Sequence, residues 1–154
     1  MTGLEMQANL KGKLNDKASA WTPAQYLNAI NEGIKYCVNI RVAKKDPEFI
    51  FPHGIINGQD EPADFISFAG NVPIEVRDLG AAGRKWYYTG STMPSVKYYK
   101  MRPLLTTLSD TIIMSYTHLM AVENYAVYKL EQMRGTLTEQ AKQAKADADG
   151  ILAL

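Results

Sequence analysis

Residues 104–134 read LLTTLSDTIIMSYTHLMAVENYAVYKLEQMR, a stretch of 31 residues without glycine or proline. Apolar side chains recur in it at helical spacing, at Leu105, Leu108, Ile112, Leu119, Ala126, Leu130 and Met133. The pattern predicts one long helix, which at about 1.5 Å per residue would measure roughly 46 Å. A compact chain of 154 residues should measure only about 35 to 40 Å across.

The opposite side of this predicted helix is also apolar, with Ile113, Tyr116, Met120 and Val127. A helix that is apolar nearly all round must be covered by other parts of a protein. We therefore expect a second protein molecule to supply part of the cover.

The composition predicts one domain over residues 1–154 with a substantial core, since 46% of the residues are hydrophobic. No window approaches the roughly 20 uncharged residues of a membrane span, and the N-terminus lacks the apolar run of a signal peptide. We therefore expect synthesis in the cytoplasm. The single cysteine, Cys37, falls on the apolar stripe of a helix and is expected to be a small buried hydrophobe.

The net charge is only +1, but the charges are unevenly distributed. Residues 46–78 hold seven acids and one base, a sum of −6, whereas residues 79–109 hold five bases and no acid, a sum of +5. Two such segments can pair within one molecule, or the acidic face of one copy can meet the basic face of the next. A head-to-tail contact of the second kind can close into a ring. The sequence leaves both arrangements open.

The clearest helix start lies at Thr22, a hydroxyl N-cap that is followed by Pro23 and, three residues after the cap, by Gln25. It predicts a helix over residues 22–44. Gly33 in the middle of this helix would cost about 1 kcal/mol relative to alanine. Close approach of a partner helix would explain its presence.

The apolar period changes from helical to two in the middle of the chain. Residues 45–62 are rich in proline, glycine and asparagine and predict a long loop. The region 62–101 predicts short antiparallel strands, including residues 84–89 and 96–101, in one small sheet that packs on the helices or protrudes as an arm. The predicted fold is mainly α with a small β insertion, an α+β helical bundle with a two- to three-stranded hairpin region.

The long helix is predicted to end at Gly135, and Thr136 with Glu139 would cap a final helix over residues 137–154. The apolar side of that helix is thin and consists of Ala141, Ala144, Ala148, Ile151, Leu152 and Leu154. Isolated helices of this length are marginal in water, so the tail is either mobile or ordered by docking on a neighbouring subunit. We expect docking.

No residue set predicts a catalytic, cofactor or metal site. His53 and His118 have no carboxylate or histidine four residues away, and we expect His118 to be partly buried and hydrogen-bonded. The best functional candidates are basic and aromatic residues between 84 and 102: Arg84, Lys85, Trp86, Tyr88, Lys97 and Tyr99. Basic groups between aromatics can bind phosphates and stack on bases, so a small nucleic-acid-binding module is an alternative hypothesis. Strand alternation argues against it, because it would bury Trp86 and Tyr88.

A longer pattern consists of WTPAQYLNAINEGI at residues 21–34, PADF at residues 62–65, the small β region, and RPLL at residues 102–105 before the long helix. This order resembles the head-to-tail adaptor (connector) proteins of tailed bacteriophages. The resemblance implies a small helical protein that forms a ring, commonly twelvefold, beneath the portal of a filled head. Such a ring joins the portal to a tail or nozzle protein in the virion neck, lets DNA pass, and has no catalytic residues or cofactor.

Under this hypothesis the helices form the ring body, the region 65–101 reaches a neighbour or the tail, and the tail helix docks on the portal or the next subunit. The lumen should be mostly acidic or neutral, since tight neutralisation of phosphates would oppose passage of DNA. The candidate interface residues are Arg84, Lys85, Trp86, Tyr88, Lys97, Tyr99, Ala141, Ala144, Ala148, Ile151 and Leu152.

Overall fold

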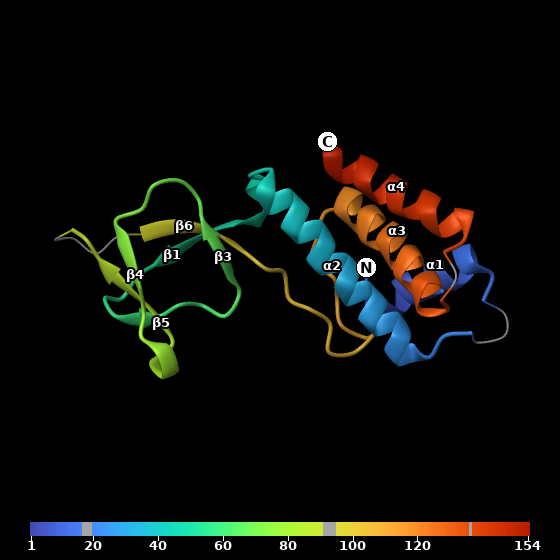
Figure 1. Cartoon of the computed structure of the whole chain (residues 1–154), viewed down its shortest axis with the longest axis horizontal. Coiled ribbons are helices and arrows are strands. Elements are labelled where there is room, and N and C mark those ends of the chain that lie inside the picture. The colour runs from blue at the N-terminus through green and yellow to red at the C-terminus, as the bar shows by residue number, and fades with distance from the viewer. Residues whose placement is uncertain (17–19, 91–94, 136) are drawn as a thin grey trace. The chain divides into compact units, whose positions relative to one another are not determined.

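A computed structural model describes residues 1–16, 20–90, 95–135 and 137–154. The chain divides into two compact units (Figure 1). The helical unit comprises Met1–Arg41 and Arg102–Leu154, and the β unit comprises Val42–Met101. Within the described ranges there are four α-helices and two three-stranded antiparallel sheets, so the predicted α+β fold class is confirmed.

The first helix, α1 (Gly3–Leu14), begins with a capping box. The backbone N–H of Thr2 donates to Glu5 Oε2 at 2.6 Å, and the N–H of Glu5 donates to Thr2 Oγ1 at 3.2 Å. These two bonds satisfy backbone donors that a helix start leaves without partners. Met6 and Leu10 then point one turn apart into the core and are fully buried.

The second helix, α2 (Pro23–Ala43), confirms the helix predicted from the Thr22 cap. Thr22 and Gln25 exchange the two bonds of a capping box, at 2.8 and 3.2 Å. Gly33 lies against the third helix, since a Cβ at this position would stand 2.7 Å from the carbonyl oxygen of Val122. The predicted close approach of a partner helix is therefore confirmed, and the partner belongs to the same chain.

The predicted helix over residues 104–134 is wrong in its first third. Only α3 (Tyr116–Met133), with 18 residues, is helical, and its N-cap is Ser115. The carboxylate of Asp110 accepts hydrogen bonds from the backbone N–H groups of Thr106 and Thr107 at 2.8 and 2.9 Å. Such local side-chain bonds compete with helical hydrogen bonding.

Hydrogen bonds to distant residues also hold this irregular segment. The amide group of Asn31 bonds both the N–H and the carbonyl of Leu105, at 2.8 and 2.9 Å. Gly3 N–H donates to the carbonyl of Asp110 at 3.0 Å, and Ile112 N–H donates to the carbonyl of Met1 at 2.9 Å. The backbone groups of the segment thus have partners outside a helix.

The shorter helix removes one argument for a second protein molecule. An 18-residue helix is about 27 Å long and does not exceed the expected diameter of a compact chain. Its inner side is covered by the chain itself, since Val122, Ala126, Val127 and Leu130 are buried. The apolar surface that stays exposed on α3 is smaller than the sequence predicts, because Val127 is buried.

The last helix, α4 (Glu139–Ala153), confirms the predicted C-terminal helix. Its N-cap is Thr138, whose hydroxyl accepts from Ala141 N–H at 3.1 Å. The predicted cap, Thr136, lies outside the described residues. Gly135 has the predicted left-handed conformation, with φ of 76°.

The β unit contains six strands and two short 3₁₀ helices within its described residues: η1 (Pro47–Phe49), β1 (Ile50–Gly54), β2 (Gln59–Asp60), β3 (Phe65–Phe68), β4 (Ile74–Asp78), η2 (Gly80–Ala82), β5 (Arg84–Tyr88) and β6 (Ser95–Lys100). They form two sheets, with the orders β1-β6-β3 and β2-β5-β4, and every pairing is antiparallel. A cluster around Trp86, Ile55 and Tyr98 forms one core to which both sheets contribute.

Two sequence predictions for this unit need correction. The alternation predicts one sheet, but β5 and β6 lie in different sheets. The composition of residues 45–62 predicts a loop, but they contain η1, β1 and β2. Pro52 is compatible with β1 because β1 is an edge strand, where a missing N–H breaks no ladder bond.

Candidate interaction surface

The aromatic residues of the predicted basic and aromatic segment are used inside the β unit. Trp86 is fully buried on the core face of β5, and its indole N–H donates to Glu61 Oε1 at 3.4 Å. Tyr88 packs on the same core and donates its hydroxyl to the carbonyl of Ile55 at 2.7 Å. Tyr99 is buried as well. Trp86 and Tyr99 are therefore not available for stacking on bases, and Tyr88 is half-buried.

The basic residues of this segment are largely paired with the acidic segment of the same chain. Arg84 lies 3.0 Å from Glu61, Lys85 lies 2.7 Å from Asp60, and Lys100 lies 3.3 Å from Asp64. The hydrogen bond to Asp60 raises the pKa of Lys85. Of the two arrangements that the sequence left open, the structure shows pairing within one molecule. Lys97 is exposed and forms no ion pair within the described ranges.

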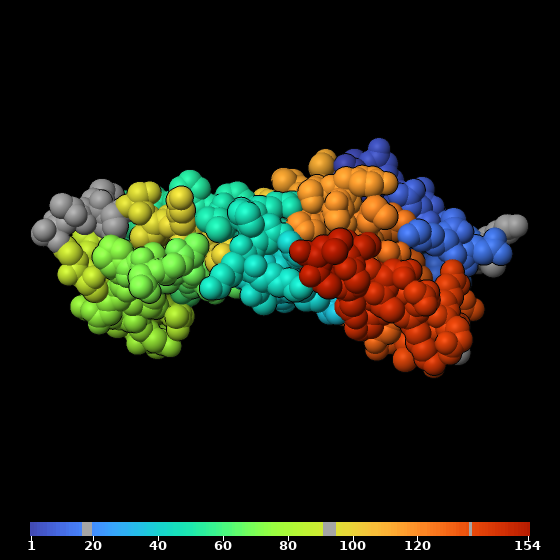
Figure 2. Space-filling view, turned by 90° about the horizontal axis from the view of Figure 1, so that it is seen from above, coloured from blue at the N-terminus to red at the C-terminus, as the bar shows by residue number. Residues whose placement is uncertain are grey.

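The alanine side of α4 is also used within the chain. Ala141, Ala144, Ala148 and Leu152 are buried, and α4 packs along α3, as the red and orange surfaces in Figure 2 show. The expectation that these four residues dock on a neighbouring subunit is therefore corrected, because their partner is their own chain. Small alanine side chains let the two helices approach closely. Ile151 is only half-buried.

A polar cluster fixes α4 to α2 on another side of the helix. The hydroxyl of Tyr36 donates to Asp149, and Lys145 donates to Asp149 at 2.8 Å and to the Tyr36 oxygen at 3.3 Å. Burial raises the pKa of Asp149, but the bonds from Lys145 and Tyr36 outweigh it and hold that pKa below its ordinary value. The Tyr36 ring stacks on Tyr125 of α3, with centroids 4.0 Å apart. The cluster ties three helices together.

Several large apolar side chains at the start of α3 are exposed. Tyr116 is 73% exposed and Met120 is 44% exposed, and Ile113, just before the helix, is 55% exposed. Tyr116, Met120 and Asn124 recur every four residues and therefore lie on one side of α3. We call this side the α3 face.

Hollows border the α3 face on both sides. Towards α1, Tyr116 and Met120 share a hollow with Met1, Asn9 and Lys13. Towards α4, Met120 and Asn124 share one with the apolar residues Ile151 and Leu154. The sequence pattern did identify Ile113, Tyr116 and Met120 as a second apolar side, together with Val127, which is buried.

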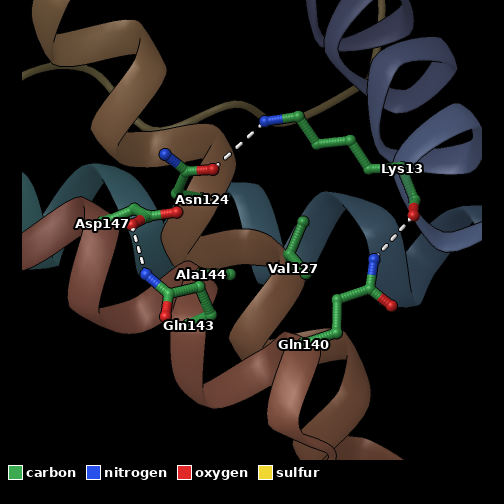
Figure 3. Close-up of a pocket in the computed structure, with 7 residues that line it drawn as sticks. All are labelled: Lys13, Asn124, Val127, Gln140, Gln143, Ala144 and Asp147. Atoms are coloured by element: carbon green, nitrogen blue, oxygen red, sulfur yellow. Dashed lines mark hydrogen bonds between the residues drawn. The ribbon is translucent and has the colours of Figure 1, made fainter.

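A third hollow, of about 300 Å³, lies between α1, α3 and α4 (Figure 3). Polar groups in it bond one another: Lys13 Nζ donates to Asn124 at 3.1 Å, Gln140 donates to the carbonyl of Lys13 at 2.8 Å, and Gln143 donates to Asp147 at 2.8 Å. Lys13 also pairs with Glu123 at 2.9 Å. The hollow adjoins the α3 face at Asn124, and most of its other lining residues are polar.

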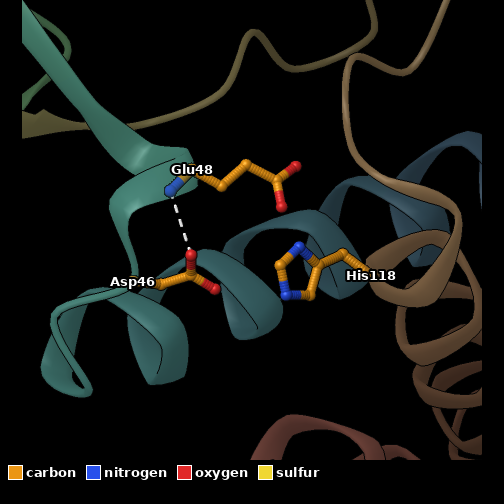
Figure 4. Close-up of side chains that lie close together, drawn as sticks. All are labelled: Asp46, Glu48 and His118. Carbon is orange, nitrogen blue, oxygen red and sulfur yellow. Dashed lines mark hydrogen bonds between the residues drawn. The ribbon is translucent and has the colours of Figure 1, made fainter.

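The remaining candidate residues have local structural roles. Cys37 is fully buried, as predicted. His118 bonds the hydroxyl of Ser115, the α3 N-cap, at 3.0 Å, which confirms that it is hydrogen-bonded. Asp46 caps η1 by accepting from the backbone N–H of Glu48 at 3.0 Å (Figure 4). His53 lies edge-on to Tyr98 and 3.4 Å from the amide of Gln59.

A comparison with models of protein families finds no match to this chain, and neither does a comparison with curated proteins. None of the helices that the structure describes has the length and apolar character that crossing a bilayer requires.

Proposed function

We propose that this chain is a structural adaptor subunit that assembles with copies of itself into a ring. The ring would lie in the neck of a tailed-phage virion, between the portal and a tail or nozzle protein, with DNA passing through its lumen. The single observation that carries the proposal is the exposed α3 face, with Ile113 beside it. The family resemblance of residues 21–34, 62–65 and 102–105 supplies the kind of assembly.

The α3 face has the chemistry of a protein contact. Large apolar side chains that gather on one exposed surface mark sites of association more often than isolated ones do. Tyr116 and Met120 belong to the residue types that interface cores favour, and the flanking hollows offer space for side chains of a neighbour. Polar groups at Asn124 and Asp147 border the apolar part, as the polar rim of an interface does.

The nucleic-acid alternative receives less support. It used Lys85, Trp86, Tyr88, Lys97 and Tyr99, of which Trp86 and Tyr99 are buried and Lys85 is ion-paired. Of these five residues, Lys97 is the exposed cation without an ion pair in the described part of the chain, whereas phosphate binding uses several cations. Passage of DNA without sequence-specific binding, as in the adaptor hypothesis, does not need a stacking surface.

A double substitution tests the proposal. Tyr116→Ser/Met120→Ser removes the apolar part of the α3 face, and Leu104→Ser/Leu137→Ser removes two exposed leucines, 38% and 47% exposed, elsewhere in the helical unit. Native mass spectrometry would measure the assembly state of each protein, alone and with a portal protein. We expect the wild type and the control to form rings and the α3 variant to form none, with an unchanged circular dichroism spectrum. A wild-type chain that forms no ring, alone or with a portal, or an α3 variant that forms rings, would contradict the proposal.

A further inference from the structure

The second sheet has an edge strand whose charges complement themselves. We propose that β4 pairs antiparallel with β4 of a second copy of this chain, with the two Val76 residues opposite each other. β4 ends the sheet order β2-β5-β4 within the described residues and lies beside β5 in Figure 1. This inference concerns the β unit and does not depend on the α3 face.

The backbone of β4 presents hydrogen-bonding groups to the open edge. Thr89 N–H donates to the carbonyl of Pro73 at 3.0 Å, and Leu79 N–H donates to the carbonyl of Gly83 at 2.9 Å. Hydrogen-bonded pairs alternate with non-bonded pairs along an antiparallel ladder, so Glu75 and Arg77 are the residues of β4 that bond β5. The N–H and carbonyl groups of Ile74, Val76 and Asp78 therefore point away from β5.

The other side of β5 supports this assignment. The carbonyl of Trp86 accepts from Gly58 at 2.7 Å, and that of Arg84 accepts from Glu61 at 2.9 Å. The backbone groups of Arg84 and Trp86 thus point to the β2 side, which leaves those of Lys85 and Tyr87 for β4. Since Lys85 is opposite Arg77, and Tyr87 is opposite Glu75, the two sides of the ladder agree.

The side chains of β4 select a partner and a register. Glu75 and Arg77 lie on the outer face of the sheet, about half exposed, and bond each other at 3.1 and 3.3 Å. With Val76 opposite Val76, Glu75 of each copy stands opposite Arg77 of the other. The two neighbouring registers that keep each side chain on the same face of the sheet are centred on position 75 or on position 77. They place the two Glu75 residues or the two Arg77 residues opposite each other. Like charges at such positions oppose pairing, so the charges favour one register.

The partner that this pattern fits is a second copy rather than an arbitrary strand. An exposed edge is a template for another strand, and charged residues on it discourage partners without the complementary charges. A twofold contact brings the same strand to both sides, so complementarity is built in. A pair of five-residue strands is far smaller than a standard interface, so the dimer should be weak and concentration-dependent.

Charge reversal tests the register. Either Glu75→Arg or Arg77→Glu places like charges opposite each other at two symmetric positions and should raise the dimer dissociation constant about tenfold. The double variant E75R/R77E restores opposite charges and should return the constant to within about threefold of wild type. Lys97→Glu, an equal charge change on an exposed residue of β6, is the matched control and should change nothing. Sedimentation equilibrium measures all five proteins. A wild type that stays monomeric at millimolar concentration, or a double variant as weak as the single ones, would overturn the inference.

Amide hydrogen exchange locates the contact independently. The N–H of Val76 should exchange more slowly as protein concentration rises, whereas the N–H of Arg77, already bonded to β5, should not respond. Equal exchange of Val76 at low and high concentration would place any dimer elsewhere and would also overturn the inference.

Discussion

The contact between α2 and α3 makes a quantitative prediction at Gly33. In an open helical position, replacing glycine by alanine stabilises a helix by about 1 kcal/mol. At Gly33, however, the new Cβ would stand 2.7 Å from the carbonyl oxygen of Val122 and 3.0 Å from Val122 Cγ1. A backbone oxygen cannot rotate away as a flexible side chain can, so the helices must shift, and overpacking of this kind costs about 1–3 kcal/mol. Taking the upper part of that range, we expect Gly33→Ala to lower the free energy of unfolding by about 1–2 kcal/mol.

The same substitution at Gly150 provides the matched control. Gly150 lies within α4, and a Cβ there meets no atom within 4 Å. Gly150→Ala should therefore raise the free energy of unfolding by about 0.5–1 kcal/mol. Urea denaturation followed by far-ultraviolet circular dichroism measures both variants, because both glycines lie in the helical unit. If Gly33→Ala were as stable as wild type or more stable, the reasoning about the close approach would be refuted.

Two carboxylates make further predictions for the helical unit. Asp110→Ala should destabilise it, because the bonds to Thr106 and Thr107 are lost, and Asp110→Asn should do so less; urea denaturation ranks the three proteins. The backbone bond from Thr107, followed by the bonds from Thr106, lowers the pKa of Asp110. The ionised Asp110 carboxylate therefore stabilises the fold at neutral pH, and this stabilisation is lost as the pH falls through the lowered pKa. The pKa of Asp149 is also lowered, so its contribution to stability is likewise lost in acid. Below the ordinary Asp pKa of 3.8, the thermal unfolding temperature of Asp149→Asn should therefore depend less on pH than that of the wild type. An unchanged pH dependence would count against the Asp149 bonds.

Local signals in the sequence predicted the elements that depend on local chemistry. The Thr22 cap and the apolar stripe after it fixed the bounds of α2 to within about two residues. The left-handed Gly135 ended α3 as expected. Glycine at position 33 correctly indicated a close helix contact, although the identity of the partner helix lay beyond the pattern.

The errors arose where distant residues decide the structure. Residues 104–115 have no glycine or proline, but Asn31, far away in sequence, bonds Leu105 and holds the segment in an irregular conformation. Partition of the strands into two sheets depends on long-range pairing, such as Phe51 with Tyr98, which alternation alone does not specify. Pro52 made an edge strand look like a loop.

The candidate surface was partly visible in the sequence. Ile113, Tyr116 and Met120 were identified as apolar residues opposite the predicted core side, and they are exposed. Periodicity could not separate them from Val127, which is buried and lines the hollow between α1, α3 and α4. The alanines of α4 showed the opposite error, since a thin apolar side proved sufficient for docking within the chain.

The most direct test of the adaptor proposal is hydroxyl-radical labelling of the α3 face in the isolated chain and in its assembly with a portal. We expect Tyr116 and Met120 to be labelled strongly in the isolated chain and to be protected in the assembly, while the exposed Leu137 serves as the internal reference. Equal labelling of Tyr116 and Met120 in both states would contradict the proposal.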